Sequence, residues 1–175
     1  EHEALHQETL AYLLHALPYE KKRRGSFIDV PRVRQAHAAA SVRIPAGRVM
    51  LGQSPGFYGW DNEFPASVVD VDAFAIDAFN VTNGEYLEYV EATGAAVPHF
   101  WLRGEREWYW RGMFEPFPLD LDAPVYVTHD EAARFAKWKN TRLPSEAEFH
   151  RAAFGTPEAV KRTASQSGRP CVASV

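Results

Sequence analysis

The chain has 175 residues, of which 46% are hydrophobic, and its formal net charge at pH 7 is -4. This length is enough for one domain core of ordinary size and a fragment of another, so we expect a soluble globular protein. The negative charge provides no long-range attraction to nucleic acid, and no apolar run approaches the length that spans a membrane. We therefore expect neither nucleic acid nor a membrane as a partner.

The sequence contains one cysteine, Cys171, which cannot form an internal disulfide. A reducing compartment is compatible with this composition, and we expect a cytoplasmic protein. The chain opens on a charged stretch with no secretory signal, and it lacks both a start methionine and a helix N-cap. We therefore expect the sequence to be a piece of a longer protein.

The most informative stretch is a predicted helix over residues 1–18, which carries His2 and His6 and ends at Pro18. Positions four apart on a helix lie one above the other, so the two imidazoles face a single point. This is how a helix offers two ligands to one metal ion. The same face continues through three leucines, Leu10, Leu13 and Leu17.

We therefore expect His2 and His6 to point into whatever buries those leucines. Imidazoles in an apolar interior need partners, which are either hydrogen-bond acceptors or a metal. Two core histidines bonded to neighbouring carbonyls are one interpretation. The spacing of the pair, beside Glu3 and Glu8, favours a metal site.

Residues 2–6 also match H-E-x-x-H, the zinc-protease pattern in which the glutamate, here Glu3, is the general base on a zinc-bound water. Such a site needs a third ligand. The extended motif would place glycine and histidine where this chain has Thr9 and Tyr12. Because a five-residue pattern recurs by chance, the zinc metalloprotease is kept as the alternative function.

After this helix, residues 25–41 have no sustained period and predict a linker. Short β segments follow: residues 42–44 and 49–51 predict two strand pieces around a turn, and alternation over residues 69–75 predicts a strand with one buried face. That pattern places Val69, Val71, Ala73 and Ala75 on the buried side.

Residues 95–123 are rich in aromatic side chains and proline, and we expect no regular element there. The rings are expected to fill the core of a domain that is poor in secondary structure. Residues 125–127 predict a short strand. The polar tail, residues 156–175, is expected to be disordered or divergent.

Three capping boxes predict where helices begin: Thr82 with Glu85, Thr128 with Glu131, and Ser145 with Glu148. Tyr86, Tyr89 and Val90 form the expected buried stripe of the first of these helices. Gly94 and Asn140 stand where a left-handed residue closes the first and second helices.

Several motifs together resemble the formylglycine-generating-enzyme fold, also called the sulfatase-modifying or C-type-lectin-like fold. They are Ile44-Pro45-Ala46-Gly47 with Leu51-Gly52, Val81-Thr82-Asn83 with Glu85-Tyr86, and Arg142-Leu143-Pro144-Ser145-Glu146-Ala147-Glu148-Phe149. The last string is the most specific. The resemblance implies an α+β domain over residues 42–155, of which this chain holds the N-terminal part. A fold alone does not determine the reaction.

Residues 1–24 resemble the last helix of a DinB-like four-helix bundle joined to this fold. Three further strings resemble the same subfamily: Pro98-His99-Phe100-Trp101, Trp110-Arg111-Gly112-Met113-Phe114 and Pro124-Val125-Tyr126-Val127. This subfamily comprises the iron(II)-dependent sulfoxide synthases of ergothioneine biosynthesis. They use dioxygen to join a thiol's sulfur to the imidazole carbon of trimethylhistidine, also named hercynine. The resemblance covers most of residues 1–158.

Members of that subfamily hold iron with three histidines, two of them from the H-x-x-x-H helix. The resemblance therefore implies Fe(2+) bound by His2 and His6, with a third histidine outside this chain. It also implies hercynine, dioxygen and either cysteine or γ-glutamylcysteine as small-molecule substrates. Because a ligand and the later part of the domain are missing, we expect this chain to be inactive alone. A non-catalytic binding module of the same fold is a further alternative.

The sequence departs from the subfamily in informative places. Some members carry a glutamine just before the second histidine that helps to bind trimethylhistidine, whereas this chain has Leu5, which implies a different subtype. The likeness fades after Pro157. Copper-dependent formylglycine-generating enzymes share the fold but use paired cysteines, and Cys171 stands in a segment that does not match them. The sulfoxide synthase is therefore the preferred reading.

Overall fold

The structure is a computed structural model, which describes residues 2–25, 40–56 and 59–155. Contacts divide the chain into two compact units. The first combines the N-terminal segment with residues 80–141, and the second combines residues 40–79 with the segment that starts at Arg142. The domain predicted over residues 42–155 is therefore shared between the units. The predicted tail, and all but the ends of the predicted linker, lie outside the described residues.

The helices of the first unit begin and end close to their predicted limits. They are α1 (His2–Ala16), α2 (Asn83–Thr93) and α3 (His129–Trp138). A short 3-10 helix that was not predicted, η1 (Tyr19–Lys21), follows α1. Complete capping boxes at Thr82 and Thr128 begin α2 and α3, as predicted. Gly94 closes α2 with a φ of 69°, and Asn140 follows α3 with a φ of 56°, so both left-handed positions are confirmed.

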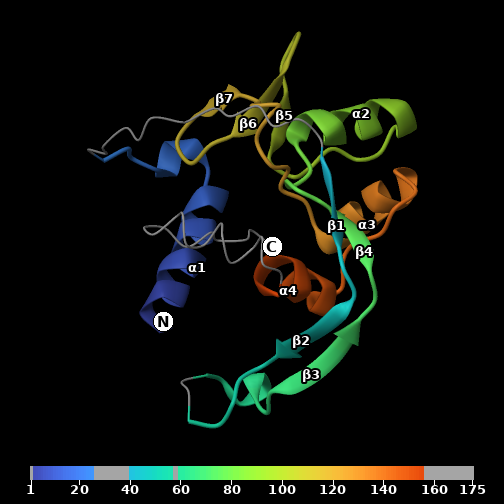
Figure 1. Cartoon of the computed structure of the whole chain (residues 1–175). Helices are drawn as coiled ribbons and strands as arrows, with labels where there is room; N and C mark the ends of the chain where they lie inside the picture. The colour runs from blue at the N-terminus through green and yellow to red at the C-terminus, as the bar shows by residue number, and fades with distance from the viewer. Residues whose placement is uncertain (1, 26–39, 57–58, 156–175) are drawn as a thin grey trace. The chain divides into compact units, whose positions relative to one another are not determined.

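A small antiparallel sheet stands where we expected no regular element. Its strands are β5 (Trp101–Arg103), β6 (Trp108–Arg111) and β7 (Pro116–Pro118), in the order β5-β6-β7 (Figure 1). Proline cannot donate to a central ladder, but β7 is an edge strand, where a missing donor is tolerated. The prediction of a strand at residues 125–127 is wrong, because those residues form no strand, and the isolated bridge between Thr82 and Pro124 lies just before them.

The core of the first unit is aromatic. Tyr86 is 1% exposed, and its ring stacks on Phe135 with centroids 5.4 Å apart. Tyr89 meets Phe135 edge-on, with centroids 5.6 Å apart. Trp101 and Val90 complete the buried cluster. Of the rings of residues 95–123 that were predicted to fill a core, Trp101 is buried, and Trp108 and Trp110 pack half-buried against the cluster. The prediction is confirmed for these three rings, and the buried stripe of α2 is confirmed as well.

Among its described residues, the second unit contains two β ribbons, one α-helix and one short 3-10 helix. Its elements are β1 (Ser41–Ile44), β2 (Gly47–Leu51), the short 3-10 helix η2 (Asp61–Glu63), β3 (Ser67–Val71), β4 (Phe74–Asp77) and α4 (Glu146–Phe154) (Figure 1). The two predicted strand pieces, β1 and β2, do not pair with each other. Instead β1 pairs with β4 and β2 pairs with β3, and α4 packs on β2 and β3.

The strand predicted over residues 69–75 is broken at Asp72 and Ala73, which separate β3 from β4. Val71 is buried, but beyond the break the less exposed side chains are Phe74 and Ile76, whereas Ala73 and Ala75 are exposed. The interruption shifts the alternation by one residue, so the predicted buried face is wrong beyond Val71.

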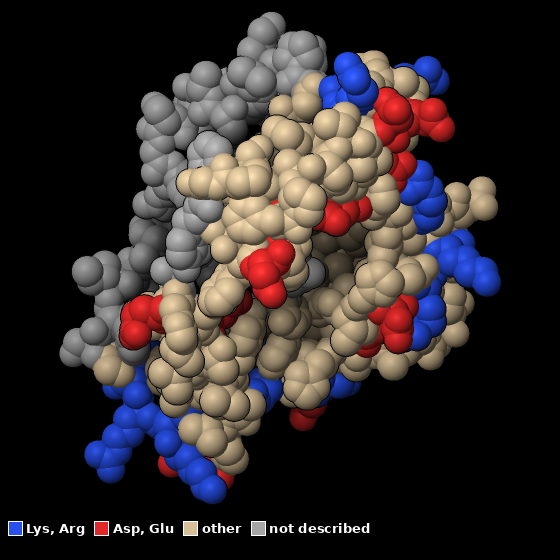
Figure 2. All heavy atoms as spheres, turned by 90° about the horizontal axis from the view of Figure 1, so that it is seen from below, with Lys and Arg blue, Asp and Glu red and all other residues tan. Residues whose placement is uncertain are grey.

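Surface features add two observations. Among the described residues, no helix is both long and apolar enough to cross a bilayer. Figure 2 shows one face of the molecule, on which small groups of Lys and Arg side chains and of Asp and Glu side chains lie among other residues and adjoin one another in several places. Charges of both signs therefore share that face.

Candidate metal centre

The two histidines of α1 converge as the spacing predicts. The Nε2 atoms of His2 and His6 lie 2.7 Å apart, and the ring centroids lie 4.6 Å apart. Both side chains are exposed. Without a metal, two nitrogens at this distance need one proton between them, so one Nε2–H donates to the other Nε2.

This pair fits one edge of a metal's coordination sphere. Two imidazole nitrogens that bind one ion at about 2.1 Å, at right angles, lie roughly 3 Å apart, close to the separation found here. Imidazole is a suitable donor for iron and for zinc. A bound ion would replace the shared proton, and each ring would then carry its proton on Nδ1.

Two donors do not complete a site. The described part of the chain contains no group of three or more His, Cys, Asp and Glu side chains that could hold a metal ion. A third protein ligand, which the resemblance assigns to an earlier helix, would therefore come from outside that part. Glu8, which stands near the histidines in the sequence, accepts a hydrogen bond of 2.9 Å from Tyr12.

The leucine face of α1 is exposed, contrary to the expectation that it is buried with the histidines. Leu10 is 57% exposed, Leu13 is 60% exposed and Leu17 is 37% exposed. No described residue of α1 is buried. The reason is that no described segment packs on this face, so the histidine pair and the leucines share an open surface.

The carboxyl end of α1, by contrast, is firmly bonded to the three-stranded sheet. His15 Nε2–H donates to the main-chain oxygen of Arg111 at 2.6 Å, and the Arg111 guanidinium donates to the main-chain oxygen of His15, also at 2.6 Å. Arg111 further donates to the oxygens of Ala16 and Leu17 at 3.4 and 3.1 Å. These are carbonyls at a helix end, which have no partner within the helix.

Aromatic contacts extend this junction. The His15 ring stacks on Phe100, with centroids 4.6 Å apart and planes 13° apart. Tyr19 donates to the oxygen of Gly112 at 3.3 Å, and its ring lies 5.4 Å from the Arg111 guanidinium carbon. The carboxylate of Glu8, with a smaller effect of Tyr126, raises the pKa of Tyr12 to about 12. Tyr12 therefore keeps its proton at neutral pH.

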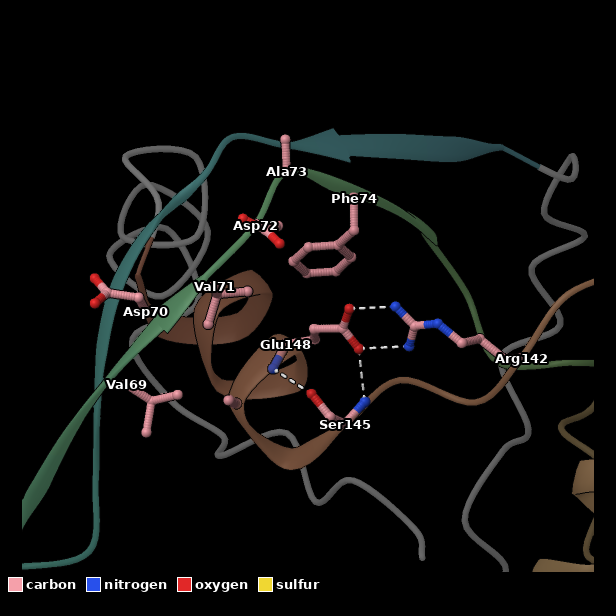
Figure 3. Close-up of a pocket in the computed structure, with 10 residues that line it drawn as sticks. Val69, Asp70, Val71, Asp72, Ala73, Phe74, Arg142, Ser145 and Glu148 are labelled. Carbon is pink, nitrogen blue, oxygen red and sulfur yellow. Dashed lines mark hydrogen bonds and ion pairs between the residues drawn. The ribbon is translucent and has the colours of Figure 1, made fainter.

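The most specific string in the sequence, Arg142 to Phe149, has a structural role. Arg142 donates to both carboxylate oxygens of Glu148, at 2.7 and 2.5 Å, and Ser145 completes the capping box with Glu148 at the start of α4 (Figure 3). These bonds hold the pKa of Glu148 at about 2, with Arg142 as the largest cause. The string therefore fastens the start of α4.

A hollow of about 440 Å³ lies beside this ion pair, between the β3–β4 segment and the start of α4. In Figure 3, Asp70 points away from Glu148, whereas the ring of Phe74 faces the ion pair. No three His, Cys, Asp or Glu side chains among the described residues that line the hollow are placed to hold a metal ion.

Comparison with known proteins settles the family. Residues 26–168 match the sulfatase-modifying factor enzyme 1-like domain, also called FGE-sulfatase. The chain belongs to this family. Its fold is accordingly a partial formylglycine-generating-enzyme-like fold, with small antiparallel sheets and four α-helices among the described residues, as the sequence motifs predicted.

Three relatives with different names are similar to this chain. The chain is 32% identical to a hercynine oxygenase of Mycolicibacterium smegmatis over 92% of its own length and 42% of the relative. It is 32% identical to ergothioneine biosynthesis protein 1 of Schizosaccharomyces pombe, over 54% of this chain and 13% of the relative. It is also 29% identical to a formylglycine-generating enzyme of Thermomonospora curvata, over 73% of this chain and 53% of the relative.

The chain thus spans less than half the length of the hercynine oxygenase that it matches. That match covers nearly the whole chain, whereas the formylglycine-generating enzyme leaves about a quarter of it uncovered. A resemblance to hercynine oxygenases is therefore shown, and the coverage favours it over the formylglycine-generating enzymes.

Sequence reasoning found the histidine pair but missed the junction at the other end of its helix. The signal was present in part, because Arg111 belongs to the Trp110–Phe114 string that resembles the subfamily. What could not be read was its partner, since His15 and Arg111 are 96 positions apart. A histidine in the last turn of a helix indicates an interaction with the helix end, not a bond to a distant strand.

Proposed function

We propose that this chain is part of an iron(II)- and dioxygen-dependent sulfoxide synthase. The enzyme would form a carbon–sulfur bond between hercynine and either cysteine or γ-glutamylcysteine, in ergothioneine biosynthesis. The observation that carries the proposal is the convergence of His2 and His6 to 2.7 Å, on a helix bonded to a domain whose relatives include hercynine oxygenases.

In this proposal His2 and His6 bind iron through Nε2, and a third histidine comes from an earlier helix of the longer protein. Iron(II) held by three protein nitrogens keeps open positions, to which a thiolate, an imidazole and dioxygen can bind. The two histidines then serve only as ligands, and they occupy two adjacent positions of the ion's coordination sphere. Each needs an acceptor for its Nδ1–H, and Glu3 is a candidate because Glu8 is engaged by Tyr12.

The exposed face of α1 supports the bundle that the proposal requires. Five leucines of this segment are exposed: Leu5, Leu10, Leu13, Leu14 and Leu17. Several large apolar side chains exposed along one helix favour an interface there. We propose that the preceding helices of a DinB-like bundle cover this face and bring the third ligand to the histidine pair.

The subtype of the enzyme, which concerns how it binds hercynine, is part of the same proposal. Leu5 stands just before His6, where some members of the subfamily have a glutamine that contacts trimethylhistidine. Leucine offers no hydrogen bond, so hercynine would be held by other residues in this protein.

The cytoplasmic location and the bounds of the bundle helix at 1–24 also stay predictions from the sequence.

Iron binding tests the site directly. Anaerobic iron(II) titration of a protein extended at both ends to the length of the hercynine oxygenases should show tight binding, and the 175-residue chain should bind much more weakly. His2→Ala and His6→Ala should each remove binding in the extended protein. Equal affinity in the two lengths would mean that the third ligand does not lie outside this chain.

Glu3→Gln separates this proposal from the zinc metalloprotease. In the protease, Glu3 is the general base, so the substitution would abolish peptide cleavage and leave the metal bound. In the sulfoxide synthase, Glu3→Gln should change turnover far less than His6→Ala does. Zinc-supported peptide hydrolysis that Glu3→Gln destroys would contradict the proposal.

A further inference from the structure

Among the described residues, the helix that carries the histidine pair is held toward its far end, where Tyr12 also interacts with Tyr126. Its carboxyl-terminal carbonyls receive three hydrogen bonds from Arg111, and Lys22 Nζ adds one to the oxygen of His15 at 3.2 Å. Burial and the neighbouring Arg111 lower the pKa of Lys22. Two cations therefore meet the negative end of the α1 dipole, where positive charge is favourable.

Arg111 is the central member of this anchor. It belongs to β6, the middle strand of the sheet, and its main-chain N–H donates to the oxygen of Phe100 at 2.7 Å. Its guanidinium reaches three successive carbonyls, which a planar group with several donors can do and a single ammonium cannot. His15 returns a bond to the Arg111 main chain, so the two residues hold each other in one orientation.

A small tilt of α1 at its carboxyl end displaces its amino end, which carries the histidines. At 1.5 Å per residue, His6 and His2 lie about 14 and 20 Å along the helix from His15. A tilt of about 10° at the anchored end therefore moves the histidine pair by roughly 2 to 3 Å. Reacting groups lose about a hundredfold in rate when they are misplaced by about 1 Å. A small change in the tilt of α1 at Arg111 would therefore produce a larger displacement of the two histidines.

We propose that Arg111 is a positioning residue for the metal held by His2 and His6. It binds neither metal nor substrate. It fixes the direction of α1 against the three-stranded sheet, and thereby fixes where the histidine pair stands relative to that sheet. This inference rests on the proposed function for its catalytic consequence, but the helix orientation itself is measurable without any metal.

The orientation is tested by a distance. Nitroxide labels on Gln7→Cys and Glu105→Cys, in the 175-residue chain carrying Cys171→Ser, report the separation of α1 from the sheet by pulsed electron resonance. The parent should give one narrow distribution. Arg111→Ala should shift its mean by about 2 Å or more, or at least double its width. A distribution that Arg111→Ala leaves unchanged would overturn the proposal, and so would a broad distribution in the parent.

A matched control and a second variant keep this test decisive. Arg103 lies in β5 of the same sheet, and its guanidinium carbon lies over the Trp108 ring at 4.7 Å. Arg103→Ala should leave the distance unchanged. If Arg111→Ala does not fold, His15→Phe serves instead, because it keeps a ring against Phe100 and removes the donor to Arg111. It should broaden the distribution, and an unaltered one would count against the anchor.

The catalytic consequence is tested in the extended protein. Arg111→Ala should leave the iron(II) dissociation constant within about twofold of the parent and lower kcat/KM at least tenfold. Arg103→Ala should change neither quantity. A loss of iron binding that matches the loss of activity would make Arg111 part of the metal site and overturn the positioning role. If the parent itself neither binds iron nor forms product, the proposed function fails, whereas the label distances still decide the anchor.

Discussion

Arg142 and Glu148 are joined by two charge-assisted hydrogen bonds, of 2.7 and 2.5 Å, across the start of α4. The same carboxylate accepts from the main chain of Ser145 at 2.8 Å. One side chain thereby links the segment that enters the helix to the helix itself. The Glu148 side chain is 12% exposed and the Arg142 side chain is 68% exposed, so the pair lies at the edge of the second unit.

This pair predicts a pH-dependent stability. The pKa of Glu148 is lowered from 4.5 to about 2, so folding favours the ionised carboxylate. Its stabilising contribution is complete above its unfolded value of 4.5 and is lost as the pH falls toward 2. Urea unfolding of the parent should therefore show a free energy of unfolding that decreases across this window. Glu148→Gln should flatten that decrease, and an unchanged slope would contradict the assignment.

The capping boxes predict losses of a defined size. Thr82→Ala removes the hydroxyl that accepts from the main chain of Glu85 and should lower the free energy of unfolding by about 1 kcal/mol. Thr128→Ala should do the same for α3. Chemical denaturation measures both, and Ser67→Ala, at an exposed strand position, is the control. Caps that cost no more than the control would show that these helix starts are held by packing alone.

The aromatic core predicts a much larger effect. Phe135 is 6% exposed and contacts the rings of Tyr86 and Tyr89, so Phe135→Ala should cost about 3 to 5 kcal/mol. Phe154, which is 65% exposed, is the matched control, and Phe154→Ala should change stability by about 0.5 kcal/mol or less. Comparable losses for the two variants would mean that the core is misassigned.

These contrasts explain what the sequence could predict. A capping box is a signal confined to four residues, and a left-handed closing position needs only a glycine or an asparagine, so α2, α3 and α4 begin where expected. Strand pairing is not local. β1 pairs with β4 about 30 positions away, and nothing in the residues around Pro45 distinguishes that from a tight hairpin.

The errors have equally specific causes. β7 was missed because prolines at 116 and 118 argue against a strand, and its edge position cannot be read from the sequence. The break at Asp72 was missed because alternation continues through it in the letters but not in the fold. In the candidate site, the spacing of His2 and His6 predicted their convergence, whereas the role of Arg111 depends on a long-range contact.

The exposed leucines give a prediction that depends on chain length. Leu13→Gln should be nearly neutral in the 175-residue chain, because this side chain is 60% exposed. In the extended protein, the proposed bundle buries Leu13, and the same substitution should cost about 2 kcal/mol or more. Thermal unfolding of both lengths measures the difference. An equal effect in the two lengths would argue against a helical bundle on this face of α1.

The central claim is the joining of a thiol to hercynine by iron held on His2 and His6. It is tested most directly by incubating the extended protein with iron(II), oxygen, hercynine and either cysteine or γ-glutamylcysteine, followed by mass spectrometry. We predict that one of the two thiols gives the sulfoxide, with oxygen consumed, and that His2→Ala and His6→Ala abolish it. Consumption of neither thiol by an iron-loaded protein, or product that persists in both histidine variants, would contradict the account.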